Sequence, residues 1–459
     1  MPEAGIDLIR LSFLQWLDAE ETDRQAKYTQ FRDYYNGDHD TQLTDRQRKF
    51  LELKTGQEFN FNLMPIVVDA LAEKLKVIAL QCEDNPELLW DWWGKNRMDA
   101  TQGIMHLSTI RDGDAYLMVE WDQEKQIPRF THQLAYDGTE GCHVVYEAGN
   151  RTQAKAAVKY WNLDDKGEYR RANIYYPDRI EKFQQRYGSS WQEYQEDGEA
   201  WPAPWVSSDG RPLGVPVIHF KNKEQGYSYG ESELEDPIPL QNALNKGLID
   251  LIAAADTTAF RLMWMTGGDP SGLSLAPGGW IFSTNPESKM GILEGANLKP
   301  MIELKDSIAI DIARVTRTPI SHFQITGHVV GEGTLKQQES GLFSKAADRE
   351  VSFGNAWEDA FYLARRLWNT YGPGGLNEDE TITCMWADPE VRNEEQLLKG
   401  LKLKRELGIP LETLWEEMGY DGEAIERIRE QLAEEEAASV SNLAQGFLNQ
   451  ARECDQGNA

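Results

Sequence analysis

Residues 238–265 read IPLQNALNKGLIDLIAAADTTAFRLMWM and form the longest apolar stretch of the chain. Positions on one face recur every three or four residues: Leu240, Leu244, Leu248, Leu251, Ala255, Thr258, Leu262 and Met265. This spacing predicts one continuous helix, about 42 Å long. A helix this apolar must be covered on most sides, by its own chain or by neighbouring chains. Polar side chains interrupt the stretch and exclude a membrane span, among them Asn245, Lys246, Asp250, Asp256 and Arg261.

Two further helical patterns follow in the second half of the chain. A shorter helix is expected from about residue 306 to 315, ending before the Thr318-Pro319 pair. Another is expected from about residue 334 to 368, roughly 52 Å long. One face of that helix is formed by Leu335, Leu342, Ala346, Phe353, Trp357, Ala360, Ala364 and Leu367. Helices of these lengths favour an elongated subunit with large lateral contacts over a compact monomer.

The connections between these helices are rich in turn-forming residues. From residue 267 to about 300, Gly and Pro alternate with short apolar runs, which predicts a small β-containing excursion. Residues 320–334 contain Gly327, Gly331 and Gly333 and are expected to form a loop.

The first half of the chain combines helices with an antiparallel β region. A proline in the first turn marks a helix at residues 65–75. Short runs rich in β-branched and aromatic residues, bounded by Gly, Asp and Asn, predict strands at residues 115–121, 142–146, 156–161, 173–176 and 217–220. The predicted fold class is therefore α+β.

The C-terminal part is expected to be a separate helical module. Helices are predicted at residues 394–407, 411–418 and 423–435, with Gly408 as the C-cap of the first. The residues that follow are polar and are expected to be loosely ordered.

The composition limits the classes of partner. Of 459 residues, 76 are acidic and 47 are basic, which gives a formal net charge of −29. A chain this acidic is a poor candidate for gripping DNA phosphates by counterion release, although it can surround DNA while repelling it. The same charge opposes self-association unless apolar interfaces offset the repulsion.

The cysteines and the N-terminus point to a reducing compartment. Cys82, Cys142, Cys384 and Cys454 have neither metal-ligand nor redox spacing, so no disulfide framework is expected. Residues 1–16 lack the basic and apolar blocks of a signal peptide.

The sequence offers little catalytic chemistry. No segment matches the phosphate-binding pattern G-x-x-x-x-G-K-[ST]. The nearest stretch, GHVVGEGTLK at residues 327–336, has Glu332 where it would repel a phosphate, and Lys336 does not follow a glycine. No zinc or calcium motif is complete, so we expect no metal, no cofactor, no catalytic residues and no enzymatic activity.

Several local strings, in their order along the chain, resemble the portal proteins of tailed bacteriophages, the long-tailed siphophage-like family. They are MPIVVDA at 64–70, LWDWWGKNR at 89–97, RDGDAY at 111–116, GVPVIHFKN at 214–222, YGESEL at 229–234 and LGIPLETLWEEMGY at 407–420. Each string alone is weak, and the pair that precedes the long apolar helix is the most specific.

The resemblance implies a portal architecture. Residues 1–235 would form the wing, 236–266 and 304–318 the two stem helices, and 267–303 the clip between them. Residues 319–334 would be the tunnel loop at the narrowest point of a channel. Residues 335–390 would return to the wing, 391–436 would form the crown, and 437–459 a polar tail.

The resemblance also implies a function. A ring of about twelve subunits at one capsid vertex would pass double-stranded DNA without sequence specificity during packaging and ejection. The DNA-facing side chains would come from the tunnel loop and its flank: Gln324, Thr326, His328, Val329, Val330, Glu332 and Lys336. In the clip, Trp280, Ile281 and Phe282 would meet the terminase large subunit and later the head-completion adaptor.

The same resemblance places the protein in the virion, and in the host cytoplasm during assembly, beside the major capsid and scaffolding proteins and away from membranes. Two other readings stay open. One is a different ring or connector component of the virion. The other is an acidic carbohydrate hydrolase that uses some of the 15 tryptophans as sugar platforms. The long helices and the lack of a catalytic constellation favour the portal.

Overall fold

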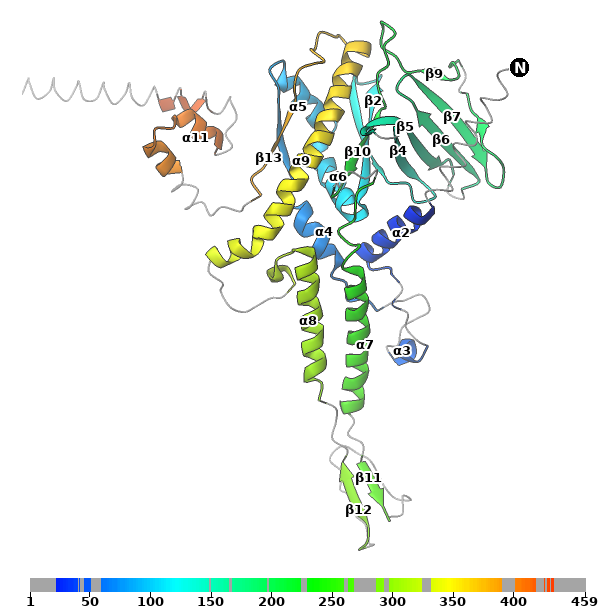
Figure 1. Ribbon diagram of the computed structural model, residues 1–459, viewed down its shortest axis with the longest axis vertical. Coiled ribbons are helices and arrows are strands. Elements are labelled where there is room, and N and C mark those ends of the chain that lie inside the picture. The colour runs from blue at the N-terminus through cyan, green and yellow to red at the C-terminus, as the bar shows by residue number, and fades with distance from the viewer. Residues whose placement is uncertain are drawn as a thin grey trace, which may run out of the picture. The chain divides into compact units, whose positions relative to one another are not determined.

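The computed structural model describes residues 22–39, 41, 45–50, 59–147, 150–164, 167–195, 198–223, 229–259, 263–267, 286–292, 297–323, 332–389, 401–417, 425, 427–429 and 431–432. The chain divides into two units, Met1–Pro389 and Glu390–Ala459. Helices and strands are mixed in the first unit (Figure 1), in agreement with the predicted α+β class.

The N-terminal helices precede and flank the sheets. They are α2 (Thr22–Asn36), α3 (Asp45–Phe50), α4 (Met64–Ala72), α5 (Pro86–Lys95) and α6 (Met98–Asp112). A proline lies in the first turn of both α4 and α5, where its missing N–H costs no intrahelical hydrogen bond. The helix predicted at residues 65–75 therefore begins at the expected place.

Two antiparallel sheets make up the β region. The first has the order β10-β2-β3, with β2 at Asp114–Asp122, β3 at Ile127–Leu134 and β10 at Val217–Lys221. The second runs β4-β5-β6-β7-β8, and β9 also pairs with β7. Its strands are β4 (Gly141–Glu147), β5 (Asn150–Asn162), β6 (Tyr169–Tyr175), β7 (Arg179–Arg186), β8 (Gln192–Glu193) and β9 (Ala203–Pro204).

Strand β2 shows how the layers are built, because its side chains alternate between two cores. Ala115, Leu117 and Val119 join the main core, which α4, α5, α6 and α9 share. Tyr116 and Met118 point to the opposite face and pack against the second sheet. A third cluster, centred on Tyr160 and Trp191, covers the outer face of that second sheet.

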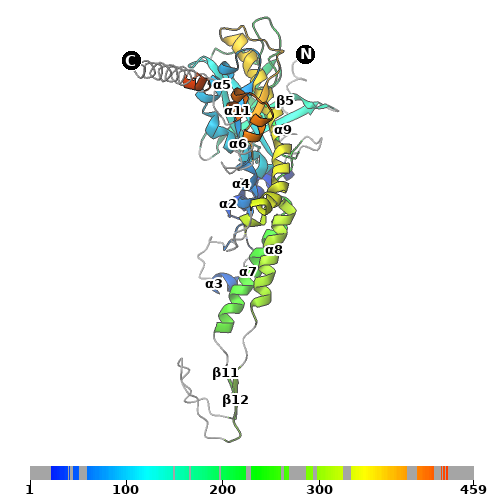
Figure 2. The same ribbon diagram turned by 90° about the vertical axis from the view of Figure 1, so that its left-hand side faces the viewer.

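The long helices are α7 (Ile238–Ala259), α8 (Lys299–Thr316) and α9 (Glu332–Tyr371), with a short 3-10 helix η1 (Ile320–His322) after α8. Helices α7 and α8 lie side by side and extend beyond the sheets in both views (Figures 1 and 2). Helix α9 packs on the first sheet and on a small sheet formed by β1 (Val77–Gln81) and β13 (Thr383–Trp386). The predicted apolar face of α9 is buried from Leu342 to Leu367.

The predicted continuous helix over residues 238–265 is too long. Helix α7 ends at Ala259, and Met263–Thr266 forms strand β11, which pairs with β12 at Lys289–Ile292. Apolar spacing alone does not separate a helix end from a short strand. Here the cross-strand hydrogen bonds between β11 and β12 compete with those of a longer helix. Trp264 lies opposite Gly291, and a Cβ added to Gly291 would come within 2.6 Å of the indole.

Helix α8 begins earlier than predicted, at Lys299, because Pro300 is accommodated in its first turn. In the second unit, residues 401–406 are helical and α11 spans Leu411–Glu417. Between them Gly408 has a φ of +94°, as its predicted role as a helix C-cap requires.

Two negative findings apply to the part of the chain just described. None of its helices combines the length and apolarity needed to cross a bilayer. Cys82, Cys142 and Cys384 are free thiols there.

Candidate functional site

The predicted DNA-facing residues lie mostly outside the described part of the chain. This applies to Gln324, Thr326, His328, Val329 and Val330, and also to Trp280, Ile281 and Phe282 of the predicted clip. Glu332 and Lys336 belong to the first turns of α9, and their side chains are likewise outside the description. These assignments stay predictions. What the structure does describe is the base of the loop, where α8 ends and α9 packs.

Helix α8 ends in a left-handed residue. Arg317 has a φ of +54°, and the N–H of Thr318 donates to the carbonyl of Ala313 at 3.0 Å. The Thr316 hydroxyl donates to the Ile312 carbonyl at 2.8 Å. Pro319 then prevents a further turn. The last carbonyls of a helix lack intrahelical partners, so the carbonyl of Thr316 needs a donor from elsewhere.

That donor is Lys345, a buried residue of α9. Its ammonium donates to the Thr316 carbonyl at 2.7 Å and to Oε2 of Glu233 at 2.8 Å. A cation is favoured at this position because the C-terminal end of a helix carries partial negative charge. One ammonium group therefore joins the end of α8, the body of α9 and the segment that leads into α7.

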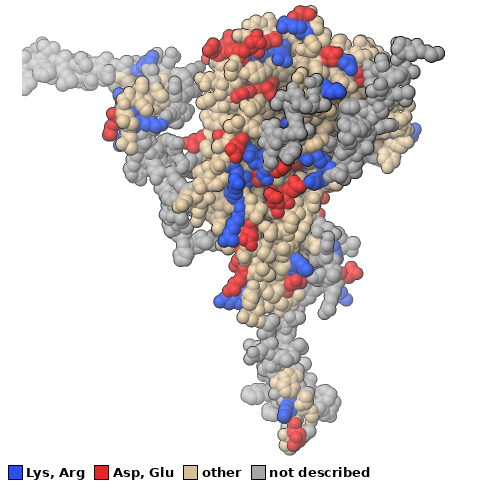
Figure 3. Space-filling model, viewed as in Figure 1, with Lys and Arg blue, Asp and Glu red and all other residues tan. Residues whose placement is uncertain are grey.

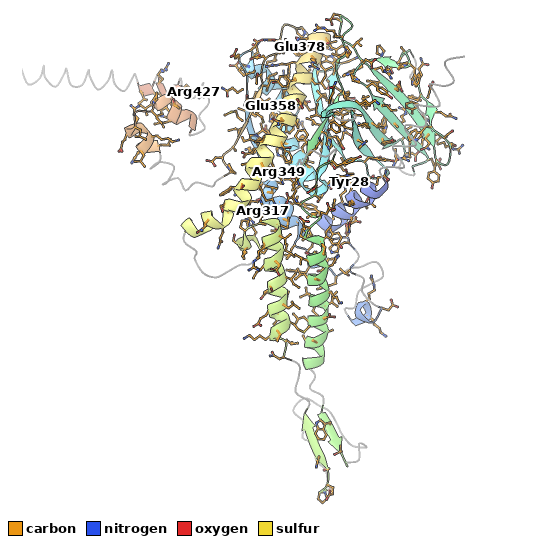
Figure 4. All side chains as sticks on the ribbon, in the orientation of Figure 1. Tyr28, Arg317, Arg349, Glu358, Glu378 and Arg427 are labelled. Atoms are coloured by element: carbon orange, nitrogen blue, oxygen red, sulfur yellow. The ribbon has the colours of Figure 1, made fainter. Side chains whose placement is uncertain are left out.

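Glu233 is the shared acceptor of this cluster. Its other oxygen, Oε1, accepts from Nη2 of Arg349 at 2.9 Å, and Lys223 lies 3.7 Å from Oε2. Burial by itself would raise the pKa of Glu233, but Lys345, Lys223 and Arg349 outweigh that effect and lower the pKa to about 2. The carboxylate is therefore charged and surrounded by cations. We call Glu233, Lys345 and Arg349 the junction cluster (Figure 4 labels Arg349 and Arg317).

The segment before α7 is held against the end of α6 through its backbone. The N–H of Glu233 donates to the Ile110 carbonyl at 3.1 Å, and that of Asn222 donates to Gly113 at 2.9 Å. A Cβ on Gly230 would lie 2.2 Å from the Gly113 carbonyl oxygen, so only glycine fits. The strings RDGDAY and YGESEL, far apart in the sequence, thus meet in one contact.

We expect Gly230→Ala to destabilise the protein by about 1–2 kcal/mol, because the new methyl group forces two backbone segments apart. Gly103→Ala in α6 is the matched control, since no atom lies within 4 Å of its added Cβ. Urea unfolding followed by tryptophan fluorescence measures both variants. Equal stability of the two would mean that the Gly113–Gly230 contact adjusts without cost.

A second buried polar centre, Asp114, anchors α2. Its carboxylate accepts from Arg24 at 2.8 Å, Tyr28 at 2.7 Å, His219 at 2.8 Å and the Gly230 N–H at 2.7 Å. Burial would raise the pKa of Asp114, but His219, Arg24 and the Gly230 N–H lower it to about 2. Since Gly230 is three residues from Glu233, the two polar centres share one short segment (Figure 4 labels Tyr28).

An open groove borders the junction cluster. Its lining includes Lys223, Val315, Arg317, Lys345 and Val351. Val315 and Val351 are 49% and 67% exposed, so apolar surface faces the solvent beside the buried ion pairs. On the face shown in Figure 3, acidic and basic side chains intermingle where α7 and α8 meet the rest of the unit.

The junction cluster was not predicted from the sequence, although one signal was present. Arg349 lies seven residues after Leu342 and seven before Ala356, so a charged side chain occupies a position of the apolar face. A buried charge requires a partner of opposite sign, which Glu233 provides. Within the described ranges, no group of His, Cys, Asp and Glu side chains is arranged to hold a metal ion.

Comparisons with known proteins agree on one family. The model of the family described as phage portal protein, SPP1 Gp6-like, matches residues 14–438. The portal protein of Mycobacterium phage L5 is 25% identical over 404 residues, covering 81% of this chain and 78% of the relative. That of Mycobacterium phage D29 is 24% identical over 407 residues, with the same coverage.

Among solved structures, a chain from the neck of an empty GTA particle aligns with a TM-score of 0.45 and 12% identity, over 75% of this chain and 88% of the other. The family match alone spans both sheets, α7, α8 and α9. The chain therefore belongs to the SPP1 Gp6-like family of phage portal proteins.

Proposed function

We propose that this portal protein assembles into a ring of about twelve subunits at one capsid vertex, and that double-stranded DNA passes through the ring during packaging and ejection. The observation that carries the proposal is the family match over residues 14–438, which includes every long helix. On this proposal the protein is a structural component of the virion, with no catalytic residues and no cofactor.

The surfaces of α7 and α8 support a ring. In α7, Leu248, Leu251 and Ile252 remain half-exposed. In α8, Leu304 and Val315 are 55% and 49% exposed. The surface over these helices in Figure 3 is largely neither acidic nor basic. When one helix pair offers apolar surface on both of its members, neighbouring copies can associate head to tail, and such heterologous contacts form a ring when the rotation between copies closes.

In this proposal α7 and α8 are the stem, and the sheets with α2–α6 and α9 form the wing. The segment that joins α7 to α8 is the clip, which ends before the predicted residue 303 because α8 begins at Lys299. Residues 319–334 are the tunnel loop, 391–436 the crown and 437–459 the tail. The junction cluster then lies at the base of the tunnel loop.

DNA would move past a surface that mostly repels it. The net charge of −29 per chain disfavours sticking, so contacts from Gln324, Thr326, His328 and Lys336 would be few and independent of sequence. Trp280, Ile281 and Phe282 in the clip would dock the terminase large subunit and later the head-completion adaptor. Capsid and scaffolding proteins would contact the ring during assembly in the host cytoplasm.

The native mass tests the ring directly. Twelve copies of the 52.3 kDa chain give roughly 630 kDa, and high salt should favour that mass because it screens like charges. Light scattering at moderate and high salt, with and without co-expressed scaffolding protein, measures it. A 52.3 kDa monomer under every condition would contradict the proposal.

A variant pair tests which surface closes the ring. Leu304→Asp places a charge on the exposed apolar side of α8 and is expected to abolish the ring while leaving the monomer folded. Leu163→Asp is the matched control, because Leu163 is 45% exposed at the end of β5 in the second sheet. If Leu304→Asp assembles, the α8 surface is not the contact. If Leu163→Asp also fails to assemble, the loss is not specific to α8, and the assignment of the contact to α8 loses its support.

A further inference from the structure

We infer that Lys345 is a positioning residue: it fixes the end of α8, and with it the base of the α8–α9 loop, to the segment that leads into α7. The inference rests on the proposed function only in taking that loop to face the channel. The geometry that carries it lies entirely within the described residues.

Lys345 connects segments that lie on both sides of the loop in the sequence. Thr316 precedes the loop, whereas Lys345 follows it on α9, so their 2.7 Å contact joins the two flanks of the loop. The same ammonium contacts Glu233, which lies five residues before the first residue of α7. A displacement of the loop is therefore resisted at α7 as well as at α9.

The two cations of the junction cluster, Lys345 and Arg349, have different roles. Arg349 binds Glu233 through Nη2 and Asn222 Oδ1 through Nε at 2.5 Å, and Ser352 donates to the Lys221 carbonyl at 3.1 Å. These bonds dock α9 on the β10–α7 segment without involving α8. Lys345 alone of the cluster reaches the end of α8, so its removal should release α8 and leave α9 in place.

The positive charge of Lys345 is stabilised by its two acceptors. Burial lowers the pKa of Lys345, while Glu233 opposes that effect. The Lys345 side chain is only 7% exposed, and the two acceptors of its ammonium group are a carboxylate and the negative end of a helix. A neutral side chain of similar length would fill the space and make neither bond. Lys345→Met therefore separates the positioning role of Lys345 from its packing.

Hydrogen exchange on the assembled protein tests the inference. In Lys345→Met, peptides covering Thr316–Phe323 should exchange about tenfold faster or more, as expected for the loss of a charged hydrogen bond. Peptides from β6 and β7 should exchange at the wild-type rate. Lys299→Met is the control, since Lys299 lies at the other end of α8 and is 78% exposed.

The outcomes are separable. Unchanged exchange at Thr316–Phe323 would overturn the inference. Uniform acceleration throughout the first unit would also overturn it, because the residue would then act on global stability only. If Lys345→Met does not fold, Lys345→Gln replaces it, because it also removes the ammonium group and leaves the Glu233–Arg349 pair in place, and the same local acceleration is expected. The native mass of each sample reports separately on the ring, so the inference and the proposed function can fail independently.

Discussion

Replacing Asp114 with Asn should destabilise the first unit by about 3–5 kcal/mol, the usual cost of removing one partner from a buried ionic network. Asp114 is fully buried and accepts four hydrogen bonds. An amide group would turn an N–H toward at least one of these donors and leave the Arg24 guanidinium without its counter-charge. Urea unfolding at neutral pH measures the loss.

The same variant should release α2 before the rest of the unit unfolds. Arg24 and Tyr28 both reach Asp114 from α2, so trypsin should cleave at Lys27 faster in Asp114→Asn than in the wild type. Asp122→Asn is the control on the same strand, because Asp122 is half-buried and its carboxylate accepts from the turn N–H groups of Glu124 and Lys125. Wild-type stability in Asp114→Asn would mean that Arg32, which binds Asp112 and Asp137, is sufficient to dock α2.

The helices and strands that could be predicted from the sequence are those whose residue pattern is compatible with only one type of secondary structure. The apolar face of α9 and the β-branched runs of β2, β5 and β10 are of this kind. Strand β7 was missed because its sequence, RIEKFQQR, is mostly charged and polar. It is a strand because it pairs with β6 from Ile180 to Arg186 and because Phe183 is buried in the cluster around Tyr160 and Trp191, and both depend on neighbours in space.

The site was less predictable for the same reason. Glycine-rich spacing indicated a loop after α8, but no local pattern relates Lys345 to Thr316 or to Glu233, which are 29 and 112 residues away. Arg349 could have been singled out by its place on an apolar face. Its partner could not, because the chain has 76 acidic residues and no charge pattern in the sequence assigns Glu233, rather than another of them, to Arg349.

Acidification should weaken the first unit through His106. This side chain is fully buried, its Nδ1 lies 3.1 Å from the Leu75 carbonyl, and its Nε2 lies 3.1 Å from Nε1 of Trp357. A carbonyl only accepts and an indole N–H only donates, so the imidazole is neutral with its proton on Nδ1. A second proton would face the indole N–H at the centre of the main core.

The sign of the effect follows from the two states. Burial lowers the pKa of His106 from 6.5 to about 4 in the folded protein, so between these values the unfolded chain binds the proton and the folded chain does not. Stability from this residue is therefore present above pH 6.5 and is lost as the pH falls toward 4, by about 2–3 kcal/mol at pH 4.5. His132 and His143, whose pKa values burial also lowers, act in the same direction.

Two variants separate His106 from those other histidines. Gln can accept from Trp357 and donate to Leu75 without titrating, so His106→Gln should be less stable than the wild type at pH 7.5 and should recover about 2–3 kcal/mol relative to it at pH 4.5. Trp357→Phe removes the indole N–H that opposes a second proton on His106, so the cost of this variant should be smaller at pH 4.5 than at pH 7.5. If His106→Gln and the wild type instead lose stability in parallel, the proton is taken up elsewhere, and the core around α6 and α9 tolerates a charged imidazole.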